Sequence, residues 1–416
     1  MRERRVVVTG LGVIAPNGIG IDNFWDSLVH GRSGVREISH FDASSYPSQM
    51  AGEIRDFDPL DFMSSKTARR MDRFAHFSVA ATRMALDDAS IEISEKNSER
   101  IGISLGSALG GIPCAEEQHS IFLEKGLNRV DPLIAIKIFS GAATSQVSVE
   151  FGIKGHSNTI GGACAAGTDS IGYAFYAIKN NLADMMIAGG AEAPIVPLTL
   201  GAFCLIKALS TRTGDPTRAS RPFDKERDGF VMGEGAGVLI LEDLDCALKR
   251  GASIYAEMLG YGTTNDAYHM VQPLPTGEQA KKAVQLALSN ANVGPSQIDY
   301  INAHGTSTPL NDKVETDVIK EVFGEYAYRV PISSTKSMIG HALGAAGSIE
   351  LVTSVLTIKN QFIHPTINYE FPDPDCDLDY VPNEGRKAVV KTVLSNSYGF
   401  GGKNSAVIIR KFRNSE

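Results

Sequence analysis

The sequence predicts an α/β protein made of two similar halves. Apolar runs typical of buried strands alternate with helical segments along the 416 residues, which is the pattern of mostly parallel sheets covered by helices. Residues 165–180 also align without gaps on residues 345–360, with six of sixteen positions identical. Matched helices 180 residues apart are what a duplicated fold produces, although two alanine-rich helices can also resemble each other by chance.

The first half alternates apolar runs that end in glycine, which favour buried strands, with segments whose apolar residues recur at helical spacing. In chain order we expect a strand at 6–8, a helix over 65–90, a strand at 101–106, a helix over 131–151, a strand at 156–160, a helix from Ala165, a strand at 184–192, a loop over 209–237 that leads to a strand at 237–241, and a helix over 243–250.

The second half restarts after Gly251, with a strand at 255–260, a helix over 277–291 and a strand at 298–302. We therefore divide the chain into two domains, residues 1–251 and residues 252–416. A hydrophobic content of 43% is enough for one large core or two ordinary ones.

The segment Gly10–Ala15 matches a loose GxGxxA dinucleotide-binding pattern, but the surrounding residues argue against that function. In a true dinucleotide-binding motif the helix begins inside the motif. Here Pro16 follows the motif, and the next helical pattern begins only near residues 22–24. We therefore discount dinucleotide binding at this segment, which follows the first predicted strand.

Composition excludes several classes of protein. A net charge of −8 argues against general nucleic-acid binding. No apolar run approaches the length of a membrane span, and the apolar run that follows the basic N-terminus is broken at once by Thr9 and Gly10. The five cysteines are odd in number and widely spaced, with no CxxC and no Cys/His cluster, so we expect neither disulfides nor a metal site. A cytoplasmic, reducing compartment fits best.

Cys164 lies in the segment GGACAAG, where no neighbour is larger than alanine. Small residues allow a sharp turn and leave the sulfur uncovered, and a helix that begins at Ala165 directs its free N–H groups at that sulfur and favours the thiolate. This is the pattern of an activated nucleophile. The alternative is a buried structural cysteine, which is common for a free thiol.

Three further segments combine small and polar residues with glycine: NAHGTSTP around His304, SSTKSMIGH ending at His341, and SNSYGFGGKN around Phe400. Both histidines end strand-like runs, and sites in α/β proteins assemble where strands end. Two neutral imidazoles near one thiolate can donate hydrogen bonds to a developing oxyanion. The glycines beside Phe400 permit positive φ and a close approach of backbone N–H groups to a substrate.

A basic face is predicted on the helix over 65–90. Lys66, Arg69, Arg70 and Arg73 recur at i, i+3, i+4 and i+7 and so share one side. An ordinary solvated face is one interpretation, and a docking surface for an acidic partner is the other.

In this order, the four segments around Cys164, His304, His341 and Phe400 resemble the signature segments of the β-ketoacyl-acyl carrier protein synthases, above all the elongating type II enzymes of fatty acid synthesis. The resemblance covers essentially the whole chain. It implies the thiolase fold, in which two similar halves form five α/β/α/β/α layers, normally in a homodimer. It implies decarboxylative condensation that extends an acyl chain by two carbons, with substrates carried on the phosphopantetheine of acyl carrier protein and with no cofactor.

The resemblance also implies roles for individual residues. Cys164 takes the acyl chain as a thioester, and His304 and His341 hold the malonyl thioester carbonyl. The amides of Cys164 and Phe400 form an oxyanion hole, and Phe400 gates the acyl pocket. Lys336, paired with Glu350, supports the site. The residues implied to contact substrate are Thr306, Thr308, Leu109, Phe203, Gly399 and Gly401. Those implied to dock the carrier protein are Lys66, Arg69 and Arg70.

Three positions depart from the usual pattern of that family: Gly162 and Lys403 replace threonine, and Asp169 replaces histidine. None removes a catalytic group. Two alternatives remain, a ketosynthase of a polyketide pathway and a catalytically silent partner subunit, and the intact Cys/His/His set argues against the second. A thiolase would need a second reactive cysteine near the C-terminus, where Cys376 is interpreted as structural.

Overall fold

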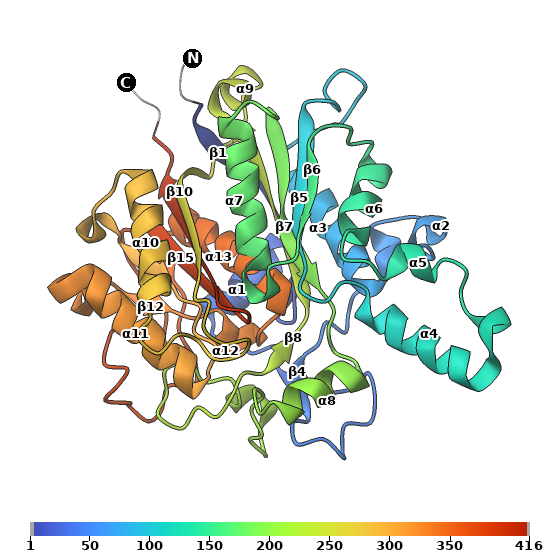
Figure 1. The fold of residues 1–416 in the computed structure, drawn as a ribbon. Coiled ribbons are helices and arrows are strands. Elements are labelled where there is room, and N and C mark those ends of the chain that lie inside the picture. Colours follow the sequence, from blue (N-terminus) through green and yellow to red (C-terminus); the bar gives the residue numbers. More distant parts are fainter. Residues whose placement is uncertain (1–3, 414–416) are drawn as a thin grey trace.

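The computed structural model describes residues 4–413, which form one large sheet with helices on its faces (Figure 1). The sheet order is β12-β11-β15-β16-β10-β1-β9-β7-β5-β6, and β2 pairs with β1. Its strands are β1 (Val6–Ala15), β2 (Gly18–Ile19), β5 (Ile101–Gly106), β6 (Ser157–Ile160), β7 (Met185–Glu192), β9 (Gly235–Asp243), β10 (Ala256–Asn265), β11 (Tyr300–Asn302), β12 (Ile332–Ser333), β15 (Thr392–Gly399) and β16 (Lys403–Lys411).

Two small sheets, thirteen α-helices and seven short 3₁₀ helices complete the described part of the chain. The small sheets contain β3 (Arg36–Glu37), β4 (Met50–Gly52) and β8 (Met232–Gly233), and β13 (Phe362–Ile363) with β14 (Arg386–Lys387). The helices are α1 (Ile21–Val29), α2 (Ser65–Ala68), α3 (Arg73–Asp88), α4 (Ile112–Lys125), α5 (Ile134–Lys137), α6 (Ala142–Phe151), α7 (Ala166–Lys179), α8 (Pro197–Leu205), α9 (Leu244–Lys249), α10 (Glu278–Ala291), α11 (Pro309–Phe323), α12 (Lys336–Ile339) and α13 (Ala346–Asn360).

The two halves of the sheet are joined only where β1 and β10 pair, over three residue pairs from Val6 to Val8. Beyond this seam they diverge and enclose α7 and α13, which pack against each other and against strands of both halves. Helix α3 covers the outer face of β1 and β9, and α10 covers β10 and β16 on the opposite side. The predicted α/β/α/β/α layering is therefore present.

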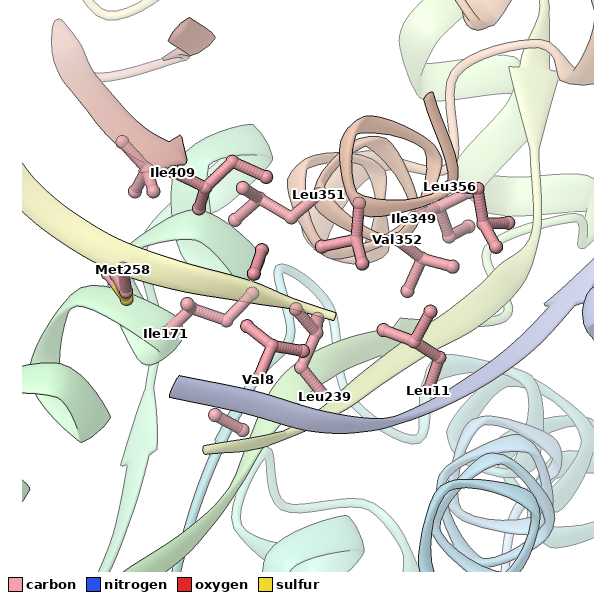
Figure 2. Close-up of a cluster of buried hydrophobic side chains, with 14 of the residues drawn as sticks. Val8, Leu11, Ile171, Leu239, Met258, Ile349, Leu351, Val352, Leu356 and Ile409 are labelled. Carbon is pink, nitrogen blue, oxygen red and sulfur yellow. The ribbon is translucent and has the colours of Figure 1, made fainter. Parts of the chain in front are cut away.

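The largest apolar cluster fills the space between the diverging halves of the sheet. Figure 2 shows Ile349 and Val352 of α13 on the side that faces Val8 and Leu11 of β1, while Leu351 lies beside Ile409 of β16. Burial of this apolar surface is the main source of stability for a central helix pair that contacts both halves.

The backbone repeats together with the sequence. A 3₁₀ turn precedes each central helix, over Ala163–Ala165 and again over Leu343–Ala345. Ala163 has φ 48° and Leu343 has φ 42°, so the same left-handed residue recurs at the 180-residue offset. The shared strained turn supports duplication more strongly than the six matching residues do.

The expectation of mostly parallel sheets is wrong. In the large sheet the parallel pairs are β5–β6, β5–β7, β11–β12 and β11–β15, and the remaining pairs are antiparallel. A parallel neighbour needs a crossover helix, and none separates β15 from β16, which are joined by a short turn at Gly401 and Gly402. Alternating strands and helices do not reveal which strand lacks that crossover.

Two predicted helices are each divided. Residues 65–90 form α2 and α3, because the Asp72 side chain accepts the N–H of Phe74 and begins a new helix there. Residues 131–151 form α5 and α6, which are separated by residues 138–141. The other predicted elements match observed ones within a few residues, apart from the first strand, which extends to Ala15.

The glycines of the GxGxxA segment lie inside β1 and not in a phosphate-binding turn. A Cβ at Gly12 would lie 1.9 Å from the Ala81 carbonyl oxygen, and one at Gly10 would lie 2.3 Å from that of Ala85. Both glycines therefore allow α3 to pack closely on the strand, which accounts for them without a dinucleotide.

All five cysteines are free thiols. Between residues 4 and 413, none of the helices has the length and apolar character needed to cross a membrane.

Candidate active site

One cavity of about 360 Å³ brings the four sequence blocks together. Cys164, His304, His341 and Phe400 all line it. Three of these residues lie close to strand ends, Phe400 after β15, Cys164 after β6 and His304 after β11. The predicted convergence of these residues is confirmed.

Cys164 lies in the 3₁₀ turn Ala163–Ala165, directly before α7. Its side chain is 7% exposed, and the predicted lowering of its pKa is wrong for the free protein. Burial raises the pKa of the thiol to about 12, although the Lys336 ammonium and the N–H of Phe400 lower it. The thiol therefore carries its proton at neutral pH, and proton loss accompanies attack on a substrate.

The two imidazoles lie edge to face, with ring centroids 5.3 Å apart. Burial lowers the pKa of both well below 6.5, and the Lys336 ammonium lowers it further. Both rings are therefore neutral at pH 7, and each carries one N–H donor. Two neutral donors suit stabilisation of an oxyanion.

Lys336 determines which ring nitrogen of His304 carries the proton. Its Nζ lies 3.3 Å from His304 Nδ1 and donates to the His304 carbonyl oxygen at 2.6 Å. An ammonium can only donate, so Nδ1 accepts and the proton is on Nε2. The expected pair between Lys336 and Glu350 is also present, with both side chains 1% exposed.

Replacing Lys336 by methionine is expected to lower the free energy of unfolding by about 3–5 kcal/mol, because it leaves a buried carboxylate without its cation. Burial already raises the pKa of Glu350 to about 7. A protonated carboxyl costs less to bury, so the loss should be larger at pH 8 than at pH 6. Urea unfolding at both pH values measures it. Lys313→Met breaks the exposed pair with Asp317 and should change the same free energy by about 0.5 kcal/mol or less.

The Phe400 loop lies against the nucleophile turn. A Cβ at Gly399 would lie 3.1 Å from the backbone nitrogen of Cys164, so glycine permits this contact. Gly401 has φ 76°, as the sequence predicted for this loop. The Phe400 ring stacks on Phe203 at a centroid distance of 6.1 Å.

The predicted substrate contacts divide into two groups. Thr306, Thr308, Phe203 and Gly399 line the cavity, and the Thr306 and Thr308 hydroxyls are 2.9 Å apart. Gly401 and Leu109 do not line it. Leu109 instead packs in the apolar cluster that surrounds Cys164.

Sequence reasoning missed two buried carboxylates that hold site loops. Glu315 of α11 accepts the N–H groups of His304 and Gly305, each at 2.8 Å. Glu192, at the end of β7, accepts those of Leu109 and Gly344, both at 3.1 Å. Burial raises the pKa of both carboxyls to about 7. Glu192 was detectable as an acidic residue on the otherwise apolar β7, whereas Glu315 lies among other charged residues of α11 and had no such signal.

Lys66, Arg69 and Arg70 are exposed on and just after α2. Arg73, which the sequence placed on the same face, belongs to α3, and its guanidinium pairs with Glu234 at 2.6 Å. The basic face is therefore smaller than predicted.

The three residues that depart from the family pattern, Gly162, Asp169 and Lys403, lie close together. The carboxylate of Asp169 would be 3.0 Å from a Cβ at Gly162. The Lys403 ammonium lowers the pKa of the Asp169 carboxyl, but burial has the larger effect and raises this pKa above its usual value.

Known proteins resemble this chain along its whole length. Residues 3–247 match the family model described as "Beta-ketoacyl synthase, N-terminal domain", and residues 255–370 match "Beta-ketoacyl synthase, C-terminal domain". The chain belongs to the β-ketoacyl synthase family. Proteins named "3-oxoacyl-[acyl-carrier-protein] synthase 2" from Synechocystis sp. and Coxiella burnetii are 48% and 46% identical to it, over 99% of each chain.

Solved β-ketoacyl synthase structures share the fold. A beta-ketoacyl synthase from Burkholderia phymatum has a TM-score of 0.91 at 35% identity and covers 99% of this chain and 100% of its own. A ketosynthase in complex with a type II polyketide acyl-carrier protein gives 0.91 at 39% identity with the same coverage. The predicted thiolase-like fold is thus confirmed.

Proposed function

We propose that this β-ketoacyl synthase is a 3-oxoacyl-[acyl-carrier-protein] synthase that elongates acyl chains in fatty acid synthesis. The Cys164 sulfur attacks an acyl thioester on acyl carrier protein, forms an acyl-cysteine thioester and releases the carrier thiol. A malonyl thioester on a second carrier then loses carbon dioxide. The resulting carbanion attacks the acyl-cysteine carbonyl, which gives a 3-oxoacyl thioester longer by two carbons and frees Cys164.

A single observation carries this proposal: one cavity holds a buried thiol and two neutral imidazoles. Cleavage of the malonyl carboxylate leaves an enolate whose oxygen needs hydrogen-bond donors, and His304 Nε2 and His341 supply them. The reaction needs no strong base and no cofactor, because loss of carbon dioxide itself generates the carbanion. Within residues 4–413, no group of three His, Cys, Asp or Glu side chains could hold a metal ion.

The proposal is tested with purified protein, an acyl-carrier-protein thioester and malonyl-carrier protein. Mass spectrometry should detect the acyl group on Cys164, and one carbon dioxide should be released for each 3-oxoacyl product. A protein that never becomes acylated would favour the alternative of a silent partner subunit.

Acyl carrier protein is the proposed partner, and Lys66, Arg69 and Arg70 are the proposed docking residues. Their exposed positive charges complement an acidic carrier, although the chain carries a net charge of −8. A related ketosynthase has been solved with its acyl-carrier protein, which supports a partner of this class.

Reversing two of these charges, in Lys66→Glu/Arg69→Glu, is expected to raise the KM for carrier-bound substrate about tenfold at low salt and to leave kcat unchanged, because the contact helps binding only. Steady-state kinetics at low and high salt measure this effect, which salt should reduce. Lys96→Glu, an exposed charge reversal outside this face, is the control. Equal KM values for wild type and the double variant at low salt would exclude this docking face.

A homodimer is the proposed assembly. Among residues 4–413, no strand pairs with the outer edge of β6, which ends the large sheet. Exposed apolar side chains lie nearby in sequence, on and around α4 and α5. Figure 1 shows α4 projecting from the body of the molecule. These exposed side chains are Phe122, Leu123, Leu127, Ile136, Ile138 and Phe139.

Sedimentation velocity should give a dimer for the wild type and a monomer for Phe139→Glu, because a charge in an apolar interface must be desolvated. Tyr328→Glu, an exposed aromatic residue elsewhere, should remain dimeric. A Phe139→Glu protein that stays dimeric at micromolar concentration would move the interface to another surface.

The domain division at residues 251 and 252 and a cytoplasmic location complete the proposal. Five free thiols, without a disulfide among them, support a reducing compartment. A polyketide ketosynthase is the second candidate, because a solved ketosynthase at 39% identity is bound to a type II polyketide acyl-carrier protein. The 3-oxoacyl synthases at 45–48% identity favour fatty acid synthesis. The product distinguishes the two candidates. An enzyme of fatty acid synthesis should extend the acyl chain once and release it, whereas a polyketide ketosynthase should extend it repeatedly without reduction.

A further inference from the structure

Asp169 lies in the first turn of α7, five residues after Cys164, and is 7% exposed. Its Oδ1 accepts a hydrogen bond from the hydroxyl of Tyr261 on β10 at 2.7 Å. The same oxygen accepts a hydrogen bond from the hydroxyl of Ser405 on β16. One carboxylate therefore joins the nucleophile helix to two strands of the other half of the sheet.

A second contact connects the same turn to β15, where the Thr168 and Ser397 hydroxyls are 2.7 Å apart. Strands β15 and β16 form the hairpin whose turn carries Phe400. The hairpin abuts the nucleophile, because even a Cβ at Gly399 would crowd the Cys164 nitrogen at 3.1 Å. A shift of α7 against this hairpin would therefore change the separation of the Cys164 and Phe400 amides.

We propose that Asp169 is a positioning residue for acyl transfer, which rests on the function proposed above. By holding α7 against β10 and β16, it keeps the amides of Cys164 and Phe400 directed at one point, where the oxyanion of the acyl thioester forms. It does not touch the substrate, and it does not contact the two imidazoles that serve the malonyl group.

The neighbours of Asp169 are adapted to it. Gly162 has φ −114°, a conformation open to any residue, so conformational freedom does not explain the glycine. The limited space around residue 162 explains the glycine, since a Cβ there would lie 3.0 Å from Asp169 Oδ2 and 3.1 Å from the Ala166 Cα. Lys403, two residues before Ser405, adds a positive charge that favours the ionised carboxyl. Gly162, Asp169 and Lys403 thus form one coupled set.

The test compares Asp169→Ala with Asp169→Asn in the full-length protein. The asparagine keeps an oxygen that accepts both hydroxyl hydrogen bonds, and the alanine removes it. Two rates are measured separately: acylation of Cys164 from an acyl-carrier-protein thioester, and release of carbon dioxide from malonyl-carrier protein.

For Asp169→Ala we expect the acylation kcat to fall about 100-fold with KM unchanged, because small misplacement of oxyanion donors costs rates of that size. Carbon dioxide release should stay within about threefold of wild type, since it uses His304 and His341. Asp169→Asn should keep acylation within about threefold. Tyr261→Phe/Ser405→Ala, which removes the donors and keeps the carboxyl, should reproduce the alanine result if Asp169→Ala does not fold.

The control is Glu242→Ala, which removes a buried carboxylate on β9 that accepts hydrogen bonds from Thr9 and Arg250 and has no contact with Asp169 among those described. It should lower the melting temperature without separating the two rates. The inference would be overturned if Asp169→Ala and Tyr261→Phe/Ser405→Ala lost acylation and carbon dioxide release equally. It would also be overturned if Asp169→Asn lost acylation as Asp169→Ala does. A wild-type protein that accepts no acyl group would instead overturn the proposed function, and this inference with it.

Discussion

Cys164→Ala should abolish acyl transfer. Removing a catalytic nucleophile lowers turnover by on the order of 10⁶-fold in a well-studied protease, and no other side chain in this cavity can form a thioester. We expect no acyl adduct by mass spectrometry and no 3-oxoacyl product. Carbon dioxide release from the malonyl thioester should persist, because the two imidazoles remain in place.

Cys376→Ala is the matched control, since Cys376 is another buried thiol and lies in a different apolar cluster. It should lower stability by the loss of a small buried side chain and leave acyl transfer intact. An acyl adduct that survives Cys164→Ala and disappears in Cys376→Ala would reverse the assignment of the nucleophile.

His341→Ala should lower carbon dioxide release by about 10²–10³-fold, the usual cost of one oxyanion donor. Acylation of Cys164 should continue, because that step relies on backbone amides. Burial holds the pKa of the His341 imidazole well below 6.5, so protonation of His341 should not lower carbon dioxide release in the wild type between pH 8 and pH 6.5. Release of carbon dioxide followed over this range measures both effects.

His364 provides a comparison for that result, because it is also fully buried and burial lowers its pKa to about 4, but it lies outside the cavity. His364→Ala should affect stability and not the rate of carbon dioxide release. If His341→Ala released carbon dioxide as fast as wild type, the assignment of His341 as a donor to the enolate would be wrong.

Short local motifs made most of this site predictable from sequence. The small residues around Cys164 predicted a sharp turn before a helix, and the turn is present. His304 and Phe400 were marked by glycine-rich segments after strands, and both line the cavity. The repeat predicted two matching helices, and the equal conformations of Ala163 and Leu343 agree with it.

Other properties depended on contacts between distant segments. Asp72 divides the helix predicted over 65–90 by capping α3, and its carboxylate also accepts the N–H of Cys114 at 2.8 Å, a partner 42 residues away. Similarly, the proton on His304 is placed by Lys336, and the partners of Glu192 come from two separate loops. A residue's own neighbourhood in the sequence carries no record of such partners.

The sequence by itself determined that Cys164, His304, His341 and Phe400 would meet in an α/β protein with two related halves. Steric limits on small residues and the directions of strand ends are local properties, so a single chain displays them. Only the tertiary structure decided that the sheet is mixed, that the Cys164 pKa is raised to about 12, and that Asp169 joins α7 to β10 and β16. Strand direction depends on which strands pair, and the pKa of a buried group depends on every atom that replaces water around it.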